Sequence, residues 1–236
     1  MNEEYGSVWR KTSELVWSQV YHDTIRGSEW LSPDQPFSPG RGAIGYPVMY
    51  VMYRILNEIH PKSILEMGMG QSTKLIGSYV AHTDGNSKHY VVEHDPEWIN
   101  FFTNHFTLPK STEIVKCDIT DVNVEIDGKT TNITSYVGLK EQIQGKKFDF
   151  IFIDGPYGYR SPDYSRVDIL DVLPQCLDEQ FVIIMDDCDR IGESNTCKMI
   201  SLVLQENGIK HHMGKYSGEK DAIIITSENL KFLCLM

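Results

Sequence analysis

Apolar and polar positions change their spacing several times along the chain, and these changes predict alternating helices and strands. Apolar residues recur at helical spacing from Ile44 to His60, where Pro61 ends the pattern. Short apolar runs follow at SILEM (63–67), HYVVE (89–93), TEIVKC (112–117), FDFIFID (148–154), QFVIIMD (180–186) and DAIIIT (221–226). Such runs are typical of strands buried on both faces of a parallel sheet.

Helical patterns separate these runs. They begin after the first run, at Pro96, and around residues 164–173 and 193–207. The alternation predicts an α/β fold, a doubly wound Rossmann-like, mostly parallel sheet with helices on both faces. Residues 122–147 interrupt the rhythm, and the segment VEIDGKTTNITSYV predicts a small hairpin that turns at Asp127–Gly128.

The first part of the chain follows a different pattern. Residues 7–25 predict an amphipathic helix whose apolar stripe comprises Val8, Leu15, Val16 and Val20. Residues 29–45 are rich in Pro, Gly and Ser and predict a loop. We therefore expect residues 1–42 to form an N-terminal helix and a lid loop. Residues 43–236 form the ligand-binding domain, which contains the insertion.

Composition limits the classes of partner that the protein is expected to bind. Lys and Arg number 22 against 33 Asp and Glu, a net charge of −11, which disfavours nonspecific binding to nucleic acid or to an anionic membrane. Five cysteines without a C-x-x-C pair favour a reduced, cytoplasmic setting. The sequence also lacks a long apolar run and an apolar signal region, so we expect no membrane partner.

Carboxylates follow most of the predicted strands. In sheets of this kind the carboxyl ends of the strands carry the ligand site. The acidic residues at those ends are Glu66, Glu93, Asp118, Asp154, Asp186 and Asp187. Their grouping on one rim predicts that the ligand site lies there.

The turn after the first strand has the sequence EMGMGQST, beginning at Glu66. Gly68 and Gly70 allow a sharp turn and close approach of a ligand, and Ser72 or Thr73 can cap the next helix. A dinucleotide motif would have a third glycine at Thr73, and Glu66 would repel a pyrophosphate. A ligand with a cationic amino group and no phosphate, such as S-adenosylmethionine, fits better.

Further binding residues follow along the rim. Glu93 is expected to accept hydrogen bonds from ribose hydroxyls, and Asp118 to accept one from an adenine amino group. The predicted cofactor-binding residues are therefore Glu66, Gly68, Gly70, Gln71, Ser72, Thr73, Glu93 and Asp118.

The motifs EMGMGQST, VVEHD, KCDIT, FIFIDGP and IIMDD, in this order, make the chain from about residue 43 to 226 resemble class I S-adenosylmethionine-dependent methyltransferases. The resemblance implies a methyltransferase domain over residues 43–236 that uses S-adenosylmethionine. The set of motifs is specific for the fold, whereas each single motif is not.

Three carboxylates form a separate motif. Asp154 ends one predicted strand, and Asp186 and Asp187 end the next. Close carboxylates repel one another unless they are protonated or paired with a cation, and Mg²⁺ prefers such oxygen ligands. Alternatively, one aspartate caps a helix and the others are solvated. The arrangement resembles the metal site of catechol-type and sugar- or natural-product-modifying O-methyltransferases, which implies that all three bind Mg²⁺.

One position departs from that resemblance. Catechol-type enzymes have a general-base lysine three residues after the first metal aspartate, where this chain has Tyr157. The base is then a metal-bound hydroxide, a histidine from elsewhere or Asp154 itself. Tyr157 and Arg160 are expected to face the acceptor, so the candidate catalytic residues are Asp154, Tyr157 and Arg160.

The resulting prediction is Mg²⁺-assisted O-methylation of a hydroxyl on a small molecule or sugar. The alternatives are a metal-independent methyltransferase, an NAD(P)-dependent oxidoreductase and a non-catalytic protein that binds S-adenosylmethionine. A homodimer that uses the N-terminal helix as its contact is also possible.

Overall fold

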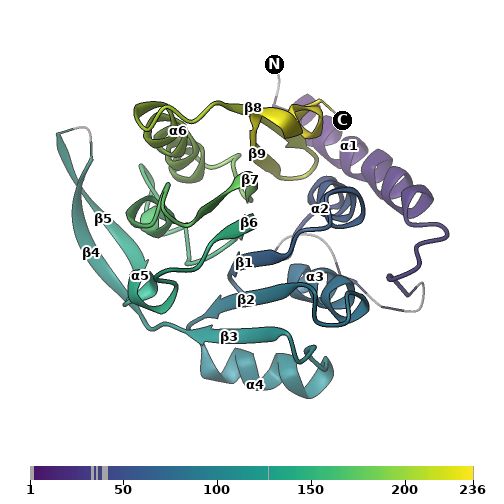
Figure 1. Cartoon of the computed structure of the whole chain (residues 1–236). Coiled ribbons are helices and arrows are strands. Elements are labelled where there is room, and N and C mark those ends of the chain that lie inside the picture. Colours follow the sequence, from purple (N-terminus) through teal and green to yellow (C-terminus); the bar gives the residue numbers. More distant parts are fainter. Residues whose placement is uncertain (1–2, 33–34, 36, 39–41, 127, 236) are drawn as a thin grey trace.

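A seven-stranded sheet forms the centre of the protein in the computed structural model, which describes residues 3–32, 35, 37–38, 42–126 and 128–235. In spatial order the strands are β3 (Thr112–Lys116), β2 (Lys88–Glu93), β1 (Ser63–Met67), β6 (Phe148–Ile153), β7 (Leu177–Met185), β9 (Asp221–Ser227) and β8 (His211–Ser217) (Figure 1). Strands β3, β2, β1, β6 and β7 are parallel, whereas β9 is antiparallel to both of its neighbours. The mostly parallel sheet predicted from the apolar runs is confirmed.

Helices cover both faces of the sheet, as predicted (Figure 1). On one face α2 (Tyr46–Glu58) and α3 (Gln71–His82) pack against alternate strand residues such as Ile64 and Phe152. Helix α4 (Pro96–His105) contacts Val91 of β2. On the other face α6 (Ile191–Glu206) packs against residues such as Ile153 and Met185. Because both faces are buried, the strands need apolar residues at successive positions.

The predicted insertion is a two-stranded antiparallel hairpin beside the main sheet (Figure 1). It comprises β4 (Ile119–Ile126) and β5 (Lys129–Tyr136), followed by the short helix α5 (Leu139–Gln142). Ile126 pairs with Lys129, which places the turn where the sequence predicts it. Asp127 itself lies outside the described residues. The hairpin begins earlier than predicted, directly after β3.

The helix predicted over residues 164–173 is wrong. The structure has only a short 3₁₀ helix, η1 (Val167–Asp171). Arg166 adopts a left-handed backbone conformation with φ 56°, which breaks a helix that would start earlier. The Asp168 carboxylate then accepts hydrogen bonds from the Ser135 hydroxyl and the Tyr136 N–H, both at 2.6 Å. These bonds fix the segment against β5.

Helix α1 (Glu3–Thr24) packs against α2 and the turn between β8 and β9 (Figure 1). The predicted apolar stripe is not its packed face, because Val8 and Leu15 are exposed. Trp17 packs against the main core and Tyr21 belongs to it. Part of the predicted lid, residues 33–34, 36 and 39–41, lies outside the described residues. The chain ends in the 3₁₀ helix η2 (Glu228–Cys234).

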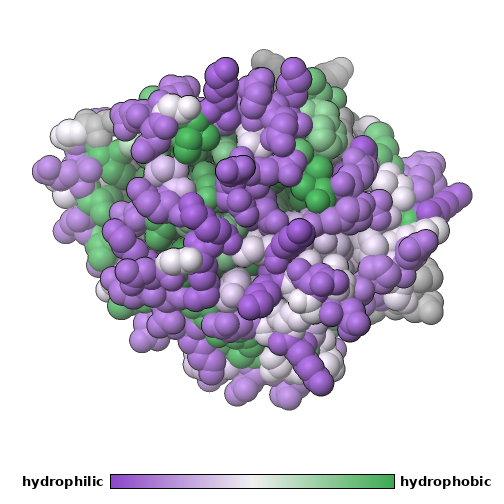
Figure 2. All heavy atoms as spheres, viewed as in Figure 1, coloured by the Kyte–Doolittle hydropathy of each residue, from purple (hydrophilic) through white to green (hydrophobic). Residues whose placement is uncertain are grey.

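Hydrophilic residues dominate the face seen in Figure 2, and apolar residues form smaller patches between them. Among the described residues, no helix combines the length and the apolar character needed to cross a membrane.

Candidate active site

A cavity of about 400 Å³ opens where β1, β2, β6 and β7 end. Its walls come from the loops that follow these strands, and they include Gly68, Glu93, Asp154, Tyr157 and Asp187. The turn between β8 and β9 adds Lys220. This is the rim on which the sequence predicts the ligand site.

The loop after β1 is tightly folded against its neighbours. Gly68 has φ +99°, and a Cβ atom there would lie 3.1 Å from the Gly155 backbone nitrogen. The Gly68 N–H donates to the Val92 carbonyl at 2.9 Å, and the Gly70 N–H donates to the Thr73 hydroxyl at 2.9 Å. Position 68 therefore requires glycine, because any side chain there would be strained and would crowd the neighbouring backbone.

Replacing Gly68 by Ala is expected to lower the free energy of unfolding by about 1–3 kcal/mol, because the side chain forces a strained φ against the Gly155 backbone. Urea unfolding monitored by circular dichroism measures this loss. Gly70→Ala is the matched control, since a Cβ atom there meets nothing within 4 Å. Equal unfolding midpoints for the two variants would show that the close contact between position 68 and the Gly155 backbone does not affect stability.

Glu93 joins the ends of β1 and β2. Its Oε2 accepts from the Met69 N–H at 3.0 Å, and its Oε1 accepts from the N–H groups of His94 and Asp95 at 2.7 and 3.0 Å. A carboxylate has about four acceptor positions, so Oε2 keeps capacity for one more donor. Glu93 thus lies where the sequence predicts a ribose contact, in the cavity wall and with an acceptor position left.

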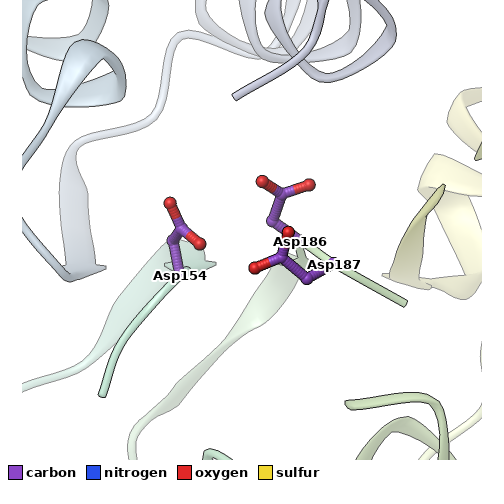
Figure 3. Close-up of side chains that lie close together, drawn as sticks. All are labelled: Asp154, Asp186 and Asp187. Atoms are coloured by element: carbon purple, nitrogen blue, oxygen red, sulfur yellow. The ribbon is translucent and has the colours of Figure 1, made fainter. Parts of the chain in front are cut away.

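The three predicted metal ligands lie together. Ile153 pairs with Met185, so the next residues of the parallel strands β6 and β7 are neighbours. Asp154, Asp186 and Asp187 each offer an oxygen, and these oxygens lie within 4.8 Å of one another. Figure 3 shows Asp154 at the end of one strand and the other two at the end of its neighbour. The predicted proximity of these carboxylates is confirmed.

Among the described residues, three cations contact these carboxylates. Arg190 Nη1 lies 3.2 Å from Asp187 Oδ2, and the other two, Arg166 and Lys220, were not predicted from the sequence. Arg166 Nη2 lies 3.1 Å from Asp154 Oδ1 and 2.7 Å from Asp187 Oδ2. Lys220 Nζ lies 2.8 Å from Asp186 Oδ2 and 2.9 Å from Asp187 Oδ1. Arg166 belongs to no recognisable motif, and Lys220 lies in a turn whose polar sequence is typical of a solvent-exposed loop. Neither position carries a signal in a single sequence.

Burial and these cations set the ionisation of the carboxylates. Burial raises the pKa of Asp154 to about 7, although Arg166 opposes the shift. Burial also raises the pKa of Asp186, against the effect of Lys220. For Asp187 burial acts in the same direction, but Arg166 and Lys220 outweigh it and lower the pKa. Burial disfavours the ammonium form of Lys220, yet the surrounding carboxylates raise its pKa.

Glu66 does not lie where the sequence analysis places it. Its side chain is wholly buried, and Oε2 lies 2.9 Å from His89 Nε2. It is absent from the cavity wall. The expectation that Glu66 faces a cationic group of the ligand is therefore wrong, because its side chain lies buried within the core beside His89 of β2.

The remaining predicted binding residues lie around the cavity rather than in it. Ser72 and Thr73 are buried in the first turn of α3, and Gln71 Oε1 accepts from the Ser38 N–H at 3.2 Å. Asp118 is exposed and does not line the cavity, so its predicted adenine contact has no support in this geometry.

The loop after β6 carries the two other candidate catalytic residues. Tyr157 lines the cavity and packs edge-on against His94, with ring centroids 5.0 Å apart. Arg160 is exposed, and its guanidinium lies 5.6 Å from the Tyr159 ring centroid. Arg160 does not itself line the cavity but lies beside Tyr159, which does, so its predicted contact with the acceptor stays a prediction.

Most of the chain is similar in fold to several solved structures. An O-methyltransferase from Bacillus cereus in complex with SAH is 14% identical with a TM-score of 0.52, over 92% of this chain and 91% of that one. A SAH-bound methyltransferase of Podospora anserina is 11% identical with a TM-score of 0.52, over 92% and 88%. No protein-family model and no curated protein matches the sequence.

A third solved structure extends the comparison to a complex with SAM. It is an O-methyltransferase from Streptomyces achromogenes that is involved in tomaymycin synthesis, 10% identical with a TM-score of 0.51, over 91% of this chain and 89% of that one. At these identities the likeness concerns the fold. The chain has the Rossmann-like fold of class I methyltransferases, as the resemblance of its motifs implies.

Proposed function

We propose that this protein transfers a methyl group from S-adenosylmethionine to a hydroxyl of a small molecule or sugar. The observation that carries the proposal is the cavity at the ends of β1, β2 and β6, where the Gly68 loop, Glu93 and Asp154 face one space. In a doubly wound sheet this rim is the ligand site. The fold is shared with methyltransferases solved with SAH or SAM.

The residues around Gly68 fit S-adenosylmethionine. Gly68 and Glu93 both line the cavity, and Glu93 Oε2 keeps an acceptor position for a ribose hydroxyl. When bound, this cofactor supplies an electrophilic methyl group on a sulfonium. The protein contributes position and charge, because the Glu93 carboxylate is held by three backbone N–H groups before any ligand arrives.

Asp154 is the residue best placed to take the proton of the acceptor hydroxyl. It lies in the cavity wall beside Tyr157, and its side chain is 24% exposed. Burial and the nearby carboxylate of Glu93 raise the pKa of Tyr157, so its hydroxyl stays protonated and serves as a hydrogen-bond donor. A carboxylate with a pKa near neutrality matches the requirement for a general base.

The predicted Mg²⁺ would be held by Asp154, Asp186 and Asp187. The contacts of these residues do not fit a resident divalent ion, because an ammonium and a guanidinium already pair with their oxygens. Mg²⁺ needs about six oxygen ligands in near-octahedral geometry. Of the buried oxygens of these three residues, Asp186 Oδ1 alone has neither a hydrogen bond nor an ion pair from the described residues. The proposed reaction therefore uses no metal.

Titration calorimetry with S-adenosylmethionine tests the proposal. Wild-type protein is expected to bind the cofactor, and Glu93→Gln is expected to bind it about tenfold or more weakly, because a charge-assisted hydrogen bond to a ribose hydroxyl is lost. Glu97→Gln is the matched control, since Glu97 is exposed on the first turn of α4.

Two results would contradict the proposal. Absence of S-adenosylmethionine binding together with binding of NAD(P) would favour an oxidoreductase. Binding without methyl transfer to any member of a panel of hydroxylated small molecules and sugars would favour a non-catalytic binding protein.

A further inference from the structure

A lysine occupies the position that the resemblance assigns to a metal ion. Lys220 stands in the turn between β8 and β9, and its Nζ bridges Asp186 and Asp187 at 2.8 and 2.9 Å. Its side chain is 16% exposed and lines the cavity. Its Nζ donates a hydrogen bond to Asp186 Oδ2, whereas the contact with Asp187 Oδ1 is an ion pair without hydrogen-bond geometry. An ammonium group has three N–H donors, so donors remain beyond the bond to Asp186. Because Lys220 lines the cavity, a remaining donor can meet a molecule bound there.

Helix α1 holds the turn that carries Lys220. The Ser13 hydroxyl and the Trp17 indole N–H both donate to the Ser217 carbonyl, at 2.7 and 3.1 Å. The Glu219 N–H donates to Glu14 Oε2 at 2.9 Å. On the other side of Lys220, Arg10 forms a bidentate pair with Asp221, with distances of 3.0 and 3.2 Å. These contacts on both sides fix the turn, so the lysine is a positioned cation.

The charge balance agrees with this arrangement. Asp154, Asp186 and Asp187 would repel one another at this spacing without positive charge between them. Arg166 bridges Asp154 and Asp187, and Lys220 bridges Asp186 and Asp187. Each of the three carboxylates thus has at least one resident cation. A divalent ion at the same oxygens would meet the ammonium at close range and would have to displace it.

We propose that the Lys220 ammonium replaces a divalent metal ion in this site and that one of its remaining N–H groups binds the acceptor oxygen. A cation hydrogen-bonded to that oxygen stabilises the negative charge that grows as the hydroxyl loses its proton. This inference rests on the proposed methyl transfer for the role of the oxygen. The replacement of the metal is independent of it and can be measured without cofactor or acceptor.

Binding of Mn²⁺ followed by electron paramagnetic resonance tests the replacement. Wild-type protein is expected to leave the signal of free Mn²⁺ unchanged. Lys220→Met removes the cation but keeps most of the length of the side chain. It is expected to bind Mn²⁺ at least about tenfold more tightly than wild type, because Asp186 then lacks its cation and Asp187 loses one of its cations. Asp186→Asn in the Lys220→Met background is expected to abolish the gain. Lys215→Met is the matched control, because Lys215 lies on the same hairpin and contacts only Asp221 among the acidic residues.

Stoichiometric Mn²⁺ binding by wild type would overturn the inference, and so would a folded Lys220→Met protein that binds no more Mn²⁺ than Lys215→Met. If Lys220→Met does not fold, the wild-type titration decides alone. For the acceptor, Lys220→Met is expected to lower kcat/KM by about tenfold or more, and EDTA is expected to leave wild-type turnover unchanged. Failure of cofactor binding in calorimetry would instead sink the proposed function and leave the Mn²⁺ result standing.

Discussion

Replacing Arg166 by Met is expected to lower the free energy of unfolding by about 3–5 kcal/mol, because the change removes the buried cation that Asp154 and Asp187 share. Arg166 is 3% exposed and pairs with Asp154 and Asp187 at 3.1 and 2.7 Å. It also donates to the Asp186 carbonyl at 3.0 Å. For a chain of this size the loss corresponds to a decrease in Tm of roughly 10 °C.

Arg160→Met provides the matched control, since Arg160 is exposed on the same loop and stacks only on Tyr159. Its effect is expected to stay within about 0.5 kcal/mol. The loss in Arg166→Met should grow as pH rises through about 7, the pKa of Asp154, because ionised carboxylates need the guanidinium and protonated ones do not. Thermal unfolding across that pH range measures both effects. A loss no larger than that of Arg160→Met, or one that shrinks with rising pH, would show that Arg166 does not neutralise the cluster.

The sheet could be predicted from the sequence because burial on both faces leaves a strong pattern. The run FDFIFID has apolar residues at successive positions, and all of β6 except Asp149 is buried. The apolar stripe predicted for α1 was misleading, because this helix packs mainly through residues outside the stripe. Val8 and Leu15 fit helical spacing but remain exposed, whereas the packed face uses Trp17, Tyr21 and polar contacts from Arg10 and Glu14. Because polar contacts help to attach α1, its packed face does not show a hydrophobic periodicity in the sequence.

The acidic rim was predictable, but its cations were not. The positions of Asp154, Asp186 and Asp187 follow from strand ends, and neighbouring parallel strands bring such ends together. Lys220 reaches them across the β8–β9 turn, and Arg166 reaches them from an irregular segment before η1. Their partners depend on tertiary packing that no local spacing encodes. The error at Glu66 is similar, since a carboxylate near a strand end can face either the ligand or a buried histidine.

Asp154→Asn is expected to lower the rate of methyl transfer by about 10²–10⁴-fold, because an amide cannot take the acceptor proton. Affinity for S-adenosylmethionine should change little, since Glu93 and the Gly68 loop hold their own hydrogen bonds without Asp154. The measurement is transfer of labelled methyl to whichever hydroxylated compound the acceptor screen identifies. Asp163→Asn is the matched control, because Asp163 is an exposed aspartate of the loop that follows Asp154.

The pH profile separates a proton acceptor from a structural carboxylate. The ionised form of Asp154 is the base, and it is populated above its pKa of about 7. Below that pH, kcat/KM of wild type should rise about tenfold per pH unit, and above it the value should level off. The Asn variant should lose this rise and keep a low, flat rate. A variant that keeps the wild-type profile would assign the base to another group in the cavity wall, of which His94 is nearest to Tyr157. The hydroxyl proton would then leave on the β2 side of the cavity, away from the Lys220 cation.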